Sequence, residues 1–342
     1  KSPSSNLRSH ENGIKSHRIF FDRGFQYDLE PLSKKRGEKS LKYEGKVMIK
    51  NISPRHKIVY YLLLPSIITL VIFTLFPFFY NLWASVQNYD LIYPNQRHFI
   101  GINNFIKAIT NEEFWSTLKT TLYFSGLGII LQLLIGLGVG LLFGREFKGK
   151  NILRTLLILP MVAMPVATAY IWRIMFSPSL GIINYILQKI GLQGSEWIAG
   201  YNTVIPSLVV VDTWQWSPFM ILIISSGLMS LPKEPYEAAK IEGATGFQTL
   251  KNITLPLLKP ILSIAFVFRL IDSFRTFDII YSLTGGGPGH ASETLNINIY
   301  LNAFRNLDIG YSGSLVIIFL FLINIVTMFV IRRTGFEESI LK

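Results

Sequence analysis

The sequence contains no cysteine, so a disulfide framework and a thiolate metal site are both excluded. Its five histidines are scattered at positions 10, 17, 56, 98 and 290, and their spacing does not predict a metal site. Charged residues make up only 16% of the chain, whereas a soluble domain carries roughly a quarter. These shortages argue against a soluble enzyme and against a small disulfide-stabilised domain.

Apolar residues make up 50% of the chain and are concentrated in six long blocks. The blocks span residues 58–83, 118–143, 153–176, 204–229, 259–283 and 312–331. About 20 apolar residues suffice for a helix to cross a bilayer. The sequence therefore predicts an all-α membrane protein with a six-helix transmembrane domain at 58–335 and a tail at 1–57.

Prolines and glycines within the apolar blocks indicate how the helices pack. Pro160, Pro165 and Pro260 are among seven prolines in these blocks, and each can kink a helix that water or neighbouring helices support. The row Gly136, Gly140 and Gly144 repeats every four residues and is typical of close helix packing. A transport pathway can use such proline breaks, whereas the glycine row is interpreted as bundle packing.

Basic residues are placed unevenly and predict the orientation. The tail 1–57 holds 14 Lys and Arg against 6 Asp and Glu, which favours a solvated segment beside anionic lipid over a nucleic-acid site. With this tail inside, 25 of the 33 Lys and Arg residues fall on the inner side. Both termini and the loop 232–260 are therefore predicted to be cytoplasmic.

The loop 232–260 combines helix starts, small residues and glycines. Pro232 and Pro235 precede Glu237, as is favourable in the first turn of a helix. Gly243 and Gly246 permit a bend. Phe247, Leu250 and Ile253 then recur every three residues and can form one apolar stripe. We expect two short helices joined at a glycine, which would make a docking element; the alternative is an ordinary loop between helices.

Three segments carry a family resemblance. Residues 237–260 resemble the "EAA" loop of importer membrane subunits. Residues 101–105 (GINNF), which follow the first block, also carry part of the resemblance. Residues 274–288 (FRTFDIIYSLTGGGP) are similar to a signature of sugar permeases. Over about residues 58–335 the chain resembles the permease subunits of carbohydrate ABC importers, of the maltose and glycerol-phosphate permease type. Leu250 departs from the Phe that is common there.

The resemblance implies a subunit of the bacterial cytoplasmic membrane that forms half of a sugar pathway by alternating access. It implies a second homologous permease, two ATPase subunits, an extracytoplasmic solute-binding protein and a carbohydrate substrate as partners. It implies neither a cofactor nor a catalytic residue. The residues that would couple this chain to an ATPase are Glu237, Ala238, Ala239, Gly243, Ala244, Phe247 and Leu250.

Charges and aromatic rings within the blocks are candidates for the substrate cavity. Arg269, Asp272, Arg275 and Asp278 recur every three residues, within reach of one another on a helix. They either line the path and bind sugar hydroxyls or form an ion-pair ladder, and Asp212 has the same two interpretations. Trp214, in the fourth block, either stacks on a sugar ring or belongs to the core. The candidate cavity residues are Trp214, Asp272, Arg275 and Asp278.

The pattern from Gly144 to Lys150 imitates a phosphate-binding loop, but Asn151 replaces the required Ser or Thr and a membrane helix precedes it. We therefore predict no nucleotide site and no enzyme activity, with ATP hydrolysis in a partner. An ion-gradient-driven secondary transporter is the alternative, but the sequence contains no internal repeat. A membrane enzyme acting on lipid-linked sugar would need paired carboxylates or a metal site.

Overall fold

The computed structural model describes residues 54–144 and 147–334, with side chains described from Tyr61 onward. The predicted basic tail 1–57 therefore lies almost entirely outside the described residues. The chain divides into two units, residues 1–60 and 61–342.

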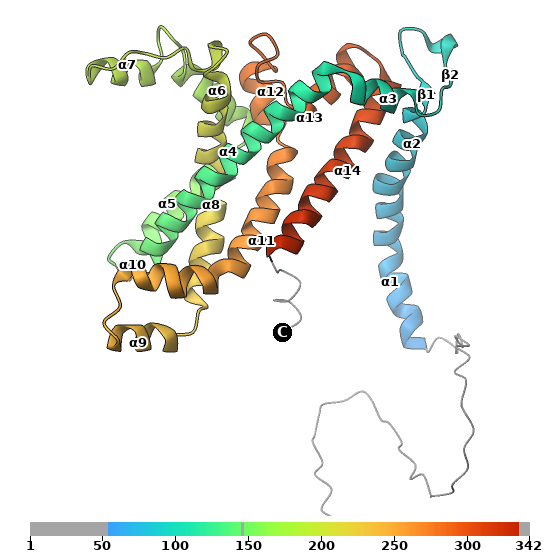
Figure 1. Ribbon diagram of the computed structural model, residues 1–342. Coiled ribbons are helices and arrows are strands. Elements are labelled where there is room, and N and C mark those ends of the chain that lie inside the picture. The colour runs from blue at the N-terminus through green and yellow to red at the C-terminus, as the bar shows by residue number, and fades with distance from the viewer. Residues whose placement is uncertain (1–53, 145–146, 335–342) are drawn as a thin grey trace, which may run out of the picture. The chain divides into compact units, whose positions relative to one another are not determined.

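The described residues are almost entirely helical, as predicted (Figure 1). The α-helices are α1 (Pro54–Leu70), α2 (Phe76–Ser85), α3 (Asn103–Thr110), α4 (Glu112–Phe143), α5 (Lys150–Val162), α6 (Pro165–Met175), α7 (Ile182–Lys189), α8 (Val204–Met229), α9 (Glu234–Ile241), α10 (Gly246–Thr249), α11 (Leu255–Phe274), α12 (Asp278–Thr284), α13 (Leu295–Tyr300) and α14 (Ile309–Thr334). Short π-helical segments follow α1, α10 and α13 at Val71–Leu75, Leu250–Thr254 and Leu301–Arg305. Strands β1 (Gln87–Asn88) and β2 (His98–Phe99) pair antiparallel, with Gln87 opposite Phe99.

Five continuous helical segments of the described residues are long and apolar enough to cross a membrane. They are Tyr61–Ser85, Glu112–Phe143, Val204–Met229, Gly246–Phe274 and Ile309–Arg333. The third predicted span, 153–176, is not one straight helix, because α5 and α6 meet at a bend of 95°. Pro165 explains the break: proline disfavours a helical conformation in the residue before it, and Met164 is extended at φ −62° and ψ 127°.

The fifth predicted span, 259–283, was also wrong in its bounds. The helical segment begins at Gly246 and its 29 residues end at Phe274. At about 1.5 Å per residue it is roughly 43 Å long, which exceeds the hydrocarbon core of about 30 Å. A helix of this length extends beyond the apolar layer. It ends before Arg275, and α12 starts separately at Asp278.

Helices α4 and α8 form the closest packed pair of the bundle. A Cβ built on Gly136 would lie 2.6 Å from Met220 Cβ, and one on Gly140 would lie 3.0 Å from Ile224 Cγ2. The predicted glycine face is thus confirmed at two of its three positions, while Gly144 meets only backbone of its own helix end. Close approach here needs glycine, since any side chain would push the helices apart.

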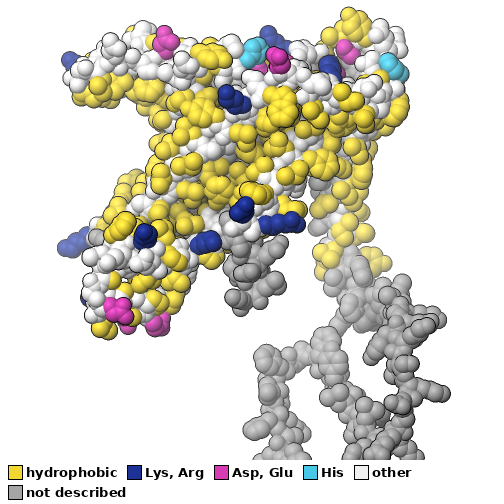
Figure 2. Space-filling view, viewed as in Figure 1, with side chains coloured by type: hydrophobic (Ala, Val, Ile, Leu, Met, Phe, Trp, Pro, Cys, Tyr) yellow, Lys and Arg dark blue, Asp and Glu magenta, His cyan; other side chains and the backbone are white. Residues whose placement is uncertain are grey.

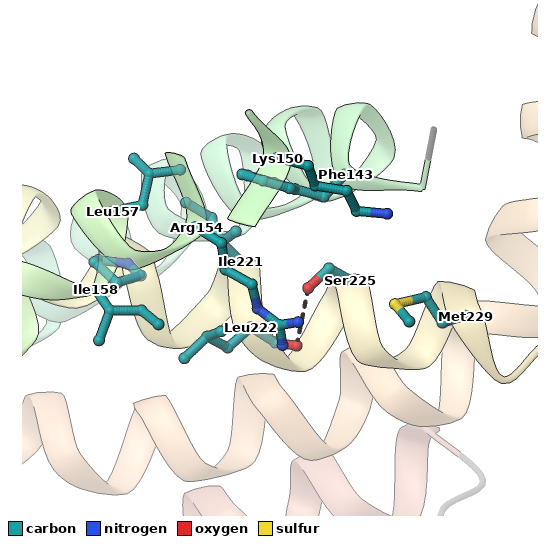
Figure 3. A pocket seen from close by; sticks show the side chains of 10 residues that line it. Phe143, Lys150, Arg154, Leu157, Ile158, Ile221, Leu222, Ser225 and Met229 are labelled. Carbon is teal, nitrogen blue, oxygen red and sulfur yellow. Dashed lines mark hydrogen bonds between the residues drawn. The ribbon is translucent and has the colours of Figure 1, made fainter. Parts of the chain in front are cut away.

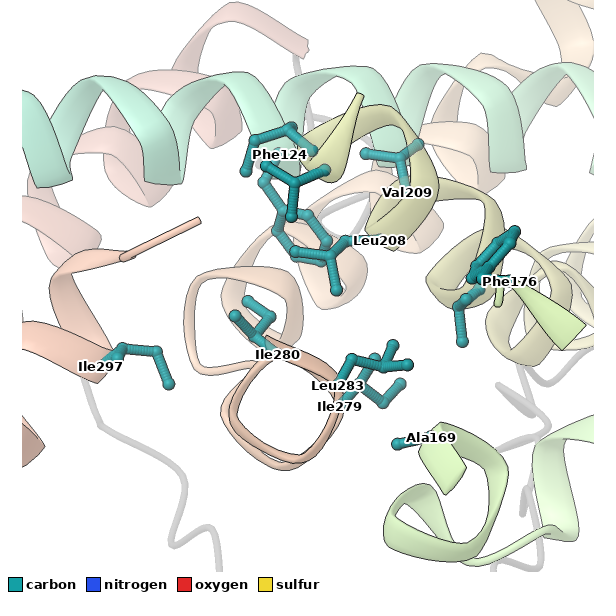
Figure 4. Packing of buried hydrophobic residues seen from close by; sticks show 12 residues of the cluster. Phe124, Ala169, Phe176, Leu208, Val209, Ile279, Ile280, Leu283 and Ile297 are labelled. Carbon is teal, nitrogen blue, oxygen red and sulfur yellow. The ribbon is translucent and has the colours of Figure 1, made fainter. Parts of the chain in front are cut away.

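Near α12 a second region of core joins α4, α6, α8 and α12 (Figure 4). Phe124, Leu208 and Ile280 are each at most 1% exposed. This cluster holds α12 against the bundle although α12 is only seven residues long. The end of the bundle that carries α12 is therefore packed as a core and is not a loose set of loops.

The surface between the two ends is apolar. Figure 2 shows hydrophobic side chains across the middle of the visible face, with Lys and Arg towards both ends. Helices α3, α6, α7, α12 and α13 lie at the end opposite α9 and α10 (Figure 1). The most apolar 18-residue stretch of the segment Tyr61–Ser85 contains no buried residue, and Phe73 within the segment is 75% exposed. Such a surface suits lipid or a neighbouring membrane subunit rather than water.

Candidate functional site

The loop between α8 and α11 folds into two short helices at a glycine, as the sequence predicts. Helix α9 starts with Glu234 and Pro235 in its first turn and ends at Ile241. Gly243 adopts the left-handed conformation at φ +75°, where residues with a side chain are strained. Thr245 and Gln248 then form a reciprocal capping box that starts α10. The turn at Gly243 reverses the chain within a few residues.

The two short helices are fixed to the bundle. Ala239 is only 7% exposed, and the backbone N–H of Ala244 donates to the carbonyl oxygen of Ala239 at 2.9 Å. The hydroxyl of Tyr236 donates to Thr254 Oγ1 at 3.2 Å, which ties α9 to the start of the transmembrane helix. A groove of about 530 Å³ lies between these segments, and Leu141 of α4 forms part of its wall. The loop is therefore a built element with a defined shape.

Apolar side chains protrude from this polar end on both sides of the turn. Ile241 is 88% exposed and Phe247 is 73% exposed. The predicted stripe of Phe247, Leu250 and Ile253 does not form one exposed face, because Leu250 and Ile253 are half-buried in the π-helical segment. Glu237 and Ala238 are exposed beside the turn. A polar end of the bundle with two protruding apolar tips is typical of a surface that binds another protein.

A buried ion-pair network connects three transmembrane helices. Arg269 of α11 donates from Nη2 to Asp212 Oδ2 of α8 at 2.5 Å and from Nε to Gln132 Oε1 of α4 at 2.6 Å. Gln132 Nε2 donates in turn to Asp212 Oδ2 at 2.8 Å. The side chains of Arg269 and Asp212 are 1% and 0% exposed. Charges at this depth are tolerated because they are paired and hydrogen-bonded.

One ion pair of this network, between Arg269 and Asp272, reaches the surface. Arg269 Nη1 donates to Asp272 Oδ2 at 2.5 Å, and the Asp272 side chain is 50% exposed. The guanidinium of Arg269 lies 5.1 Å from the ring centroid of Trp216, in cation–π range. Gly128 makes room for the carboxylate, since a Cβ there would lie 3.4 Å from Asp212 Oδ2. The other oxygen of that carboxylate, Asp212 Oδ1, accepts no hydrogen bond from a described residue.

The predicted ladder of four charges exists only in its first step. Arg269 and Asp272 pair, but α11 ends at Phe274, so Arg275 and Asp278 do not continue the row. Arg275 faces a different cavity, of about 610 Å³, and its carbonyl oxygen accepts from Asn296 Nδ2 at 2.9 Å. Asp278 is exposed at the first residue of α12. The ladder interpretation is therefore limited to Arg269 and its neighbours.

Trp214 lies away from this network. It is 43% exposed and packs edge-on against Trp172 of α6, with ring centroids 5.9 Å apart. Of the four residues proposed from the sequence for the substrate cavity, Arg275 lines the cavity of about 610 Å³ described above. Their role in contacting substrate stays a prediction.

Sequence reasoning missed Gln132, Trp216 and Ile241. Gln132 is fully buried between the two charged partners, and a lone amide in the apolar run 118–143 was a signal for it. Trp216 lies two positions after Trp214 in the same apolar block, and the block alone does not show that its ring faces Arg269. Ile241 gave no signal, because its exposure depends on the turn at Gly243.

An apolar cavity lies towards the α9–α10 end between α4, α5 and α8 (Figure 3). Phe143, Leu157, Ile221 and Met229 line it, and Arg154 reaches across it towards Ser225. No group of His, Cys, Asp and Glu among the described residues could hold a metal ion.

The bundle has an apolar middle surface, a buried charged network and a folded loop at one end. Together these features are typical of an integral membrane subunit of the transport class. Residues 132–334 match the family of binding-protein-dependent transport system inner membrane components. That match covers more than half of the chain, and the chain belongs to this family.

Curated relatives and a solved structure agree with the assignment. The chain is 34% identical over 257 residues to the trehalose/maltose transport system permease protein MalF of Thermococcus litoralis, covering 75% of this chain and 85% of that protein. It is 32% identical over 286 residues to the sn-glycerol-3-phosphate transport system permease protein UgpA of Agrobacterium fabrum, covering 82% and 96%. A chain of a bacterial alginate ABC transporter, solved with an alginate pentasaccharide-bound periplasmic protein, has the same fold, with a TM-score of 0.72 at 23% identity, covering 82% and 96%.

Proposed function

We propose that this chain is the transmembrane subunit of an ATP-driven importer for sugars or oligosaccharides and forms half of the translocation pathway. Family membership supports the transport role. The relatives named for trehalose, maltose and sn-glycerol-3-phosphate support the substrate class. The observation that carries the coupling part is the folded α9–α10 loop with its two exposed apolar tips.

The loop is suited to transmit force from a separate ATPase. Ile241 and Phe247 would enter an apolar cleft of the ATPase, and the turn at Gly243 would hold them in position. Helix α10 continues through Leu250–Thr254 into α11 without a break up to Phe274. A movement of the loop would therefore reach Arg269, and through Arg269 it would reach α4 and α8. The predicted coupling residues Glu237, Ala238, Ala239, Gly243, Ala244, Phe247 and Leu250 belong to this proposal.

The pathway requires partners on both sides of the membrane. With both termini in the cytoplasm, α9 and α10 would face two ATPase subunits, and α12 and α13 would face an extracytoplasmic solute-binding protein. The half-exposed carboxylate of Asp272 would face a path shared with a second, homologous permease. Alternating access would then consist of rearranging the helices around the Arg269 network. The predicted substrate contacts Trp214, Asp272, Arg275 and Asp278 belong to this proposal.

Glycine substitutions test the coupling role with a matched control. A Cβ at Gly243 or at Gly246 would meet no atom within 4 Å, but only Gly243 has a positive φ. Gly243→Val should strain the turn by about 1–2 kcal/mol, whereas Gly246→Val should leave it intact. We expect Gly243→Val to lower recovery of the ATPase on co-purification while membrane insertion survives.

Equal ATPase recovery by both variants would count against the docking role. The secondary-transporter alternative is tested in proteoliposomes, where uptake should require the ATPase subunits and ATP. Uptake by this chain alone under an ion gradient would reverse the assignment. Family membership makes that outcome unexpected.

A further inference from the structure

A second cavity, of about 690 Å³, lies at the end opposite the α9–α10 loop. Its walls come from α6, α12, the last residue of α13 and the π-helical segment Leu301–Arg305. Its volume falls within the roughly 300–1,000 Å³ typical of small-molecule sites. None of the interactions described for the Arg269 network or the α9–α10 loop involves it.

Aromatic rings form one wall of this cavity. The rings of Tyr281 and Tyr300 are 5.0 Å apart between centroids, and those of Tyr300 and Phe304 are 5.1 Å apart. Phe277 stacks behind Tyr281 at 5.1 Å with an interplanar angle of 14°. Tyr281 and Phe304 remain 39% and 69% exposed. Such rings can accept the C–H face of a sugar and supply hydroxyl groups at their edges.

Two arginines complete the lining. Arg173 comes from the last turn of α6 and Arg305 from the last turn of the segment Leu301–Arg305. Both are exposed, and neither forms an ion pair with another described residue. No carboxylate lines the cavity. Glu293, in the neighbouring loop, is 2% exposed and is already hydrogen-bonded to His290 and Asn298.

Two guanidinium groups beside an aromatic wall favour one class of ligand. Guanidinium binds carboxylates through two parallel hydrogen bonds and keeps its charge at every physiological pH. A neutral sugar would use the rings but would leave both cations without a counter-charge. A lipid chain would not match the tyrosine hydroxyls or the charges.

From this lining we infer that the outer cavity receives a carboxylate-bearing saccharide before it enters the membrane path. The inference rests on the proposed function, since it assigns a substrate class to a sugar importer. Arg173 and Arg305 would hold the carboxylates, and Tyr281 and Tyr300 would stack against the rings.

The test uses the importer purified with its co-assembled subunits and without the solute-binding protein. Binding of tetragalacturonate and of neutral maltotetraose is measured by calorimetry at low salt. We expect tetragalacturonate to bind more tightly. Arg173→Gln and Arg305→Gln should each weaken that binding about 10- to 100-fold, as expected for the loss of a charge-assisted hydrogen bond. Lys189→Gln removes an outer cation that lies on Tyr185, away from the cavity, and should change nothing.

Several results would overturn the inference. They are equal binding of the two probes, no binding of tetragalacturonate by the intact complex, or an equal loss in the Lys189→Gln control. Loss of solute-binding-protein capture by the arginine variants, with tetragalacturonate binding unchanged, would assign the two cations to a protein contact instead. ATP-driven uptake of any saccharide by the same complex would keep the proposed function in place while this inference fails.

Discussion

The buried network around Arg269 makes the sharpest prediction about stability. Replacing Arg269 by Met removes the partner of a fully buried carboxylate, because Asp212 is 0% exposed and keeps only Gln132. Breaking a buried ion pair from one side costs about 3–5 kcal/mol. The lost pair with half-exposed Asp272 adds only about 0–1 kcal/mol. We therefore expect Arg269→Met to lower the free energy of unfolding by about 3–5 kcal/mol.

The double variant separates charge burial from simple loss of contacts. Arg269→Met with Asp212→Asn leaves two neutral amides, at positions 212 and 132, which can hydrogen-bond to each other. The double variant should be more stable than Arg269→Met alone by about 2 kcal/mol, because no uncompensated charge remains buried. Asp272→Asn is the control, and its loss should stay near or below about 1 kcal/mol.

The assay is reversible unfolding in bicelles for the wild-type chain, the single variants and the double variant. Coupling appears as the difference between the double variant and the sum of the singles. If the two single losses simply add in the double variant, the network does not bury an ion pair and the reasoning is refuted. An unchanged stability of Arg269→Met would refute it equally.

Two further predictions concern packing and pH. Gly136→Leu should separate α4 from α8, because a Cβ at position 136 would already lie 2.6 Å from Met220 Cβ. Thermal unfolding should show that the free energy of unfolding falls by about 1–3 kcal/mol. Gly138→Leu is the control, because a Cβ there meets nothing within 4 Å, and it should cause no such loss. In the loop between α12 and α13, the hydrogen bond to Glu293 raises the pKa of His290. The imidazolium therefore stabilises the loop fully below the ordinary pKa of about 6.5 and loses this effect as pH rises through the raised value. Hydrogen exchange of residues 285–293, corrected for intrinsic rates, should show less protection above that pH, and His290→Asn should abolish the dependence.

The fold class could be read from the sequence because its signals are strong and local. Apolar blocks of about 20 residues predict membrane helices by length alone. Gly243 marked a turn that the structure places at φ +75°. Gly136 and Gly140 marked the close contact of α4 with α8. Each of these features depends on residues that are neighbours in sequence or on one helix face.

The parts that could not be predicted depend on distant residues. Gln132 meets Arg269 across 137 positions of the chain, and no periodicity carries that information. The bounds of the fifth span could not be predicted, because its helix already begins at Gly246, within the loop 232–260. Ile241 is the last residue of α9, and its exposure depends on how the turn at Gly243 places α9 relative to α10. Tertiary placement decides all three.

Cross-linking at the α9–α10 loop tests the central claim most directly. The chain has no cysteine, so Ile241→Cys provides one unique thiol at an 88% exposed position. In inverted membrane vesicles carrying the whole importer, the account predicts that this thiol is reached by an impermeant maleimide and cross-links to the ATPase subunit. It also predicts that ATP binding changes the cross-linking yield. A thiol labelled only from the extracytoplasmic side, or one that never cross-links to an ATPase, would contradict the account.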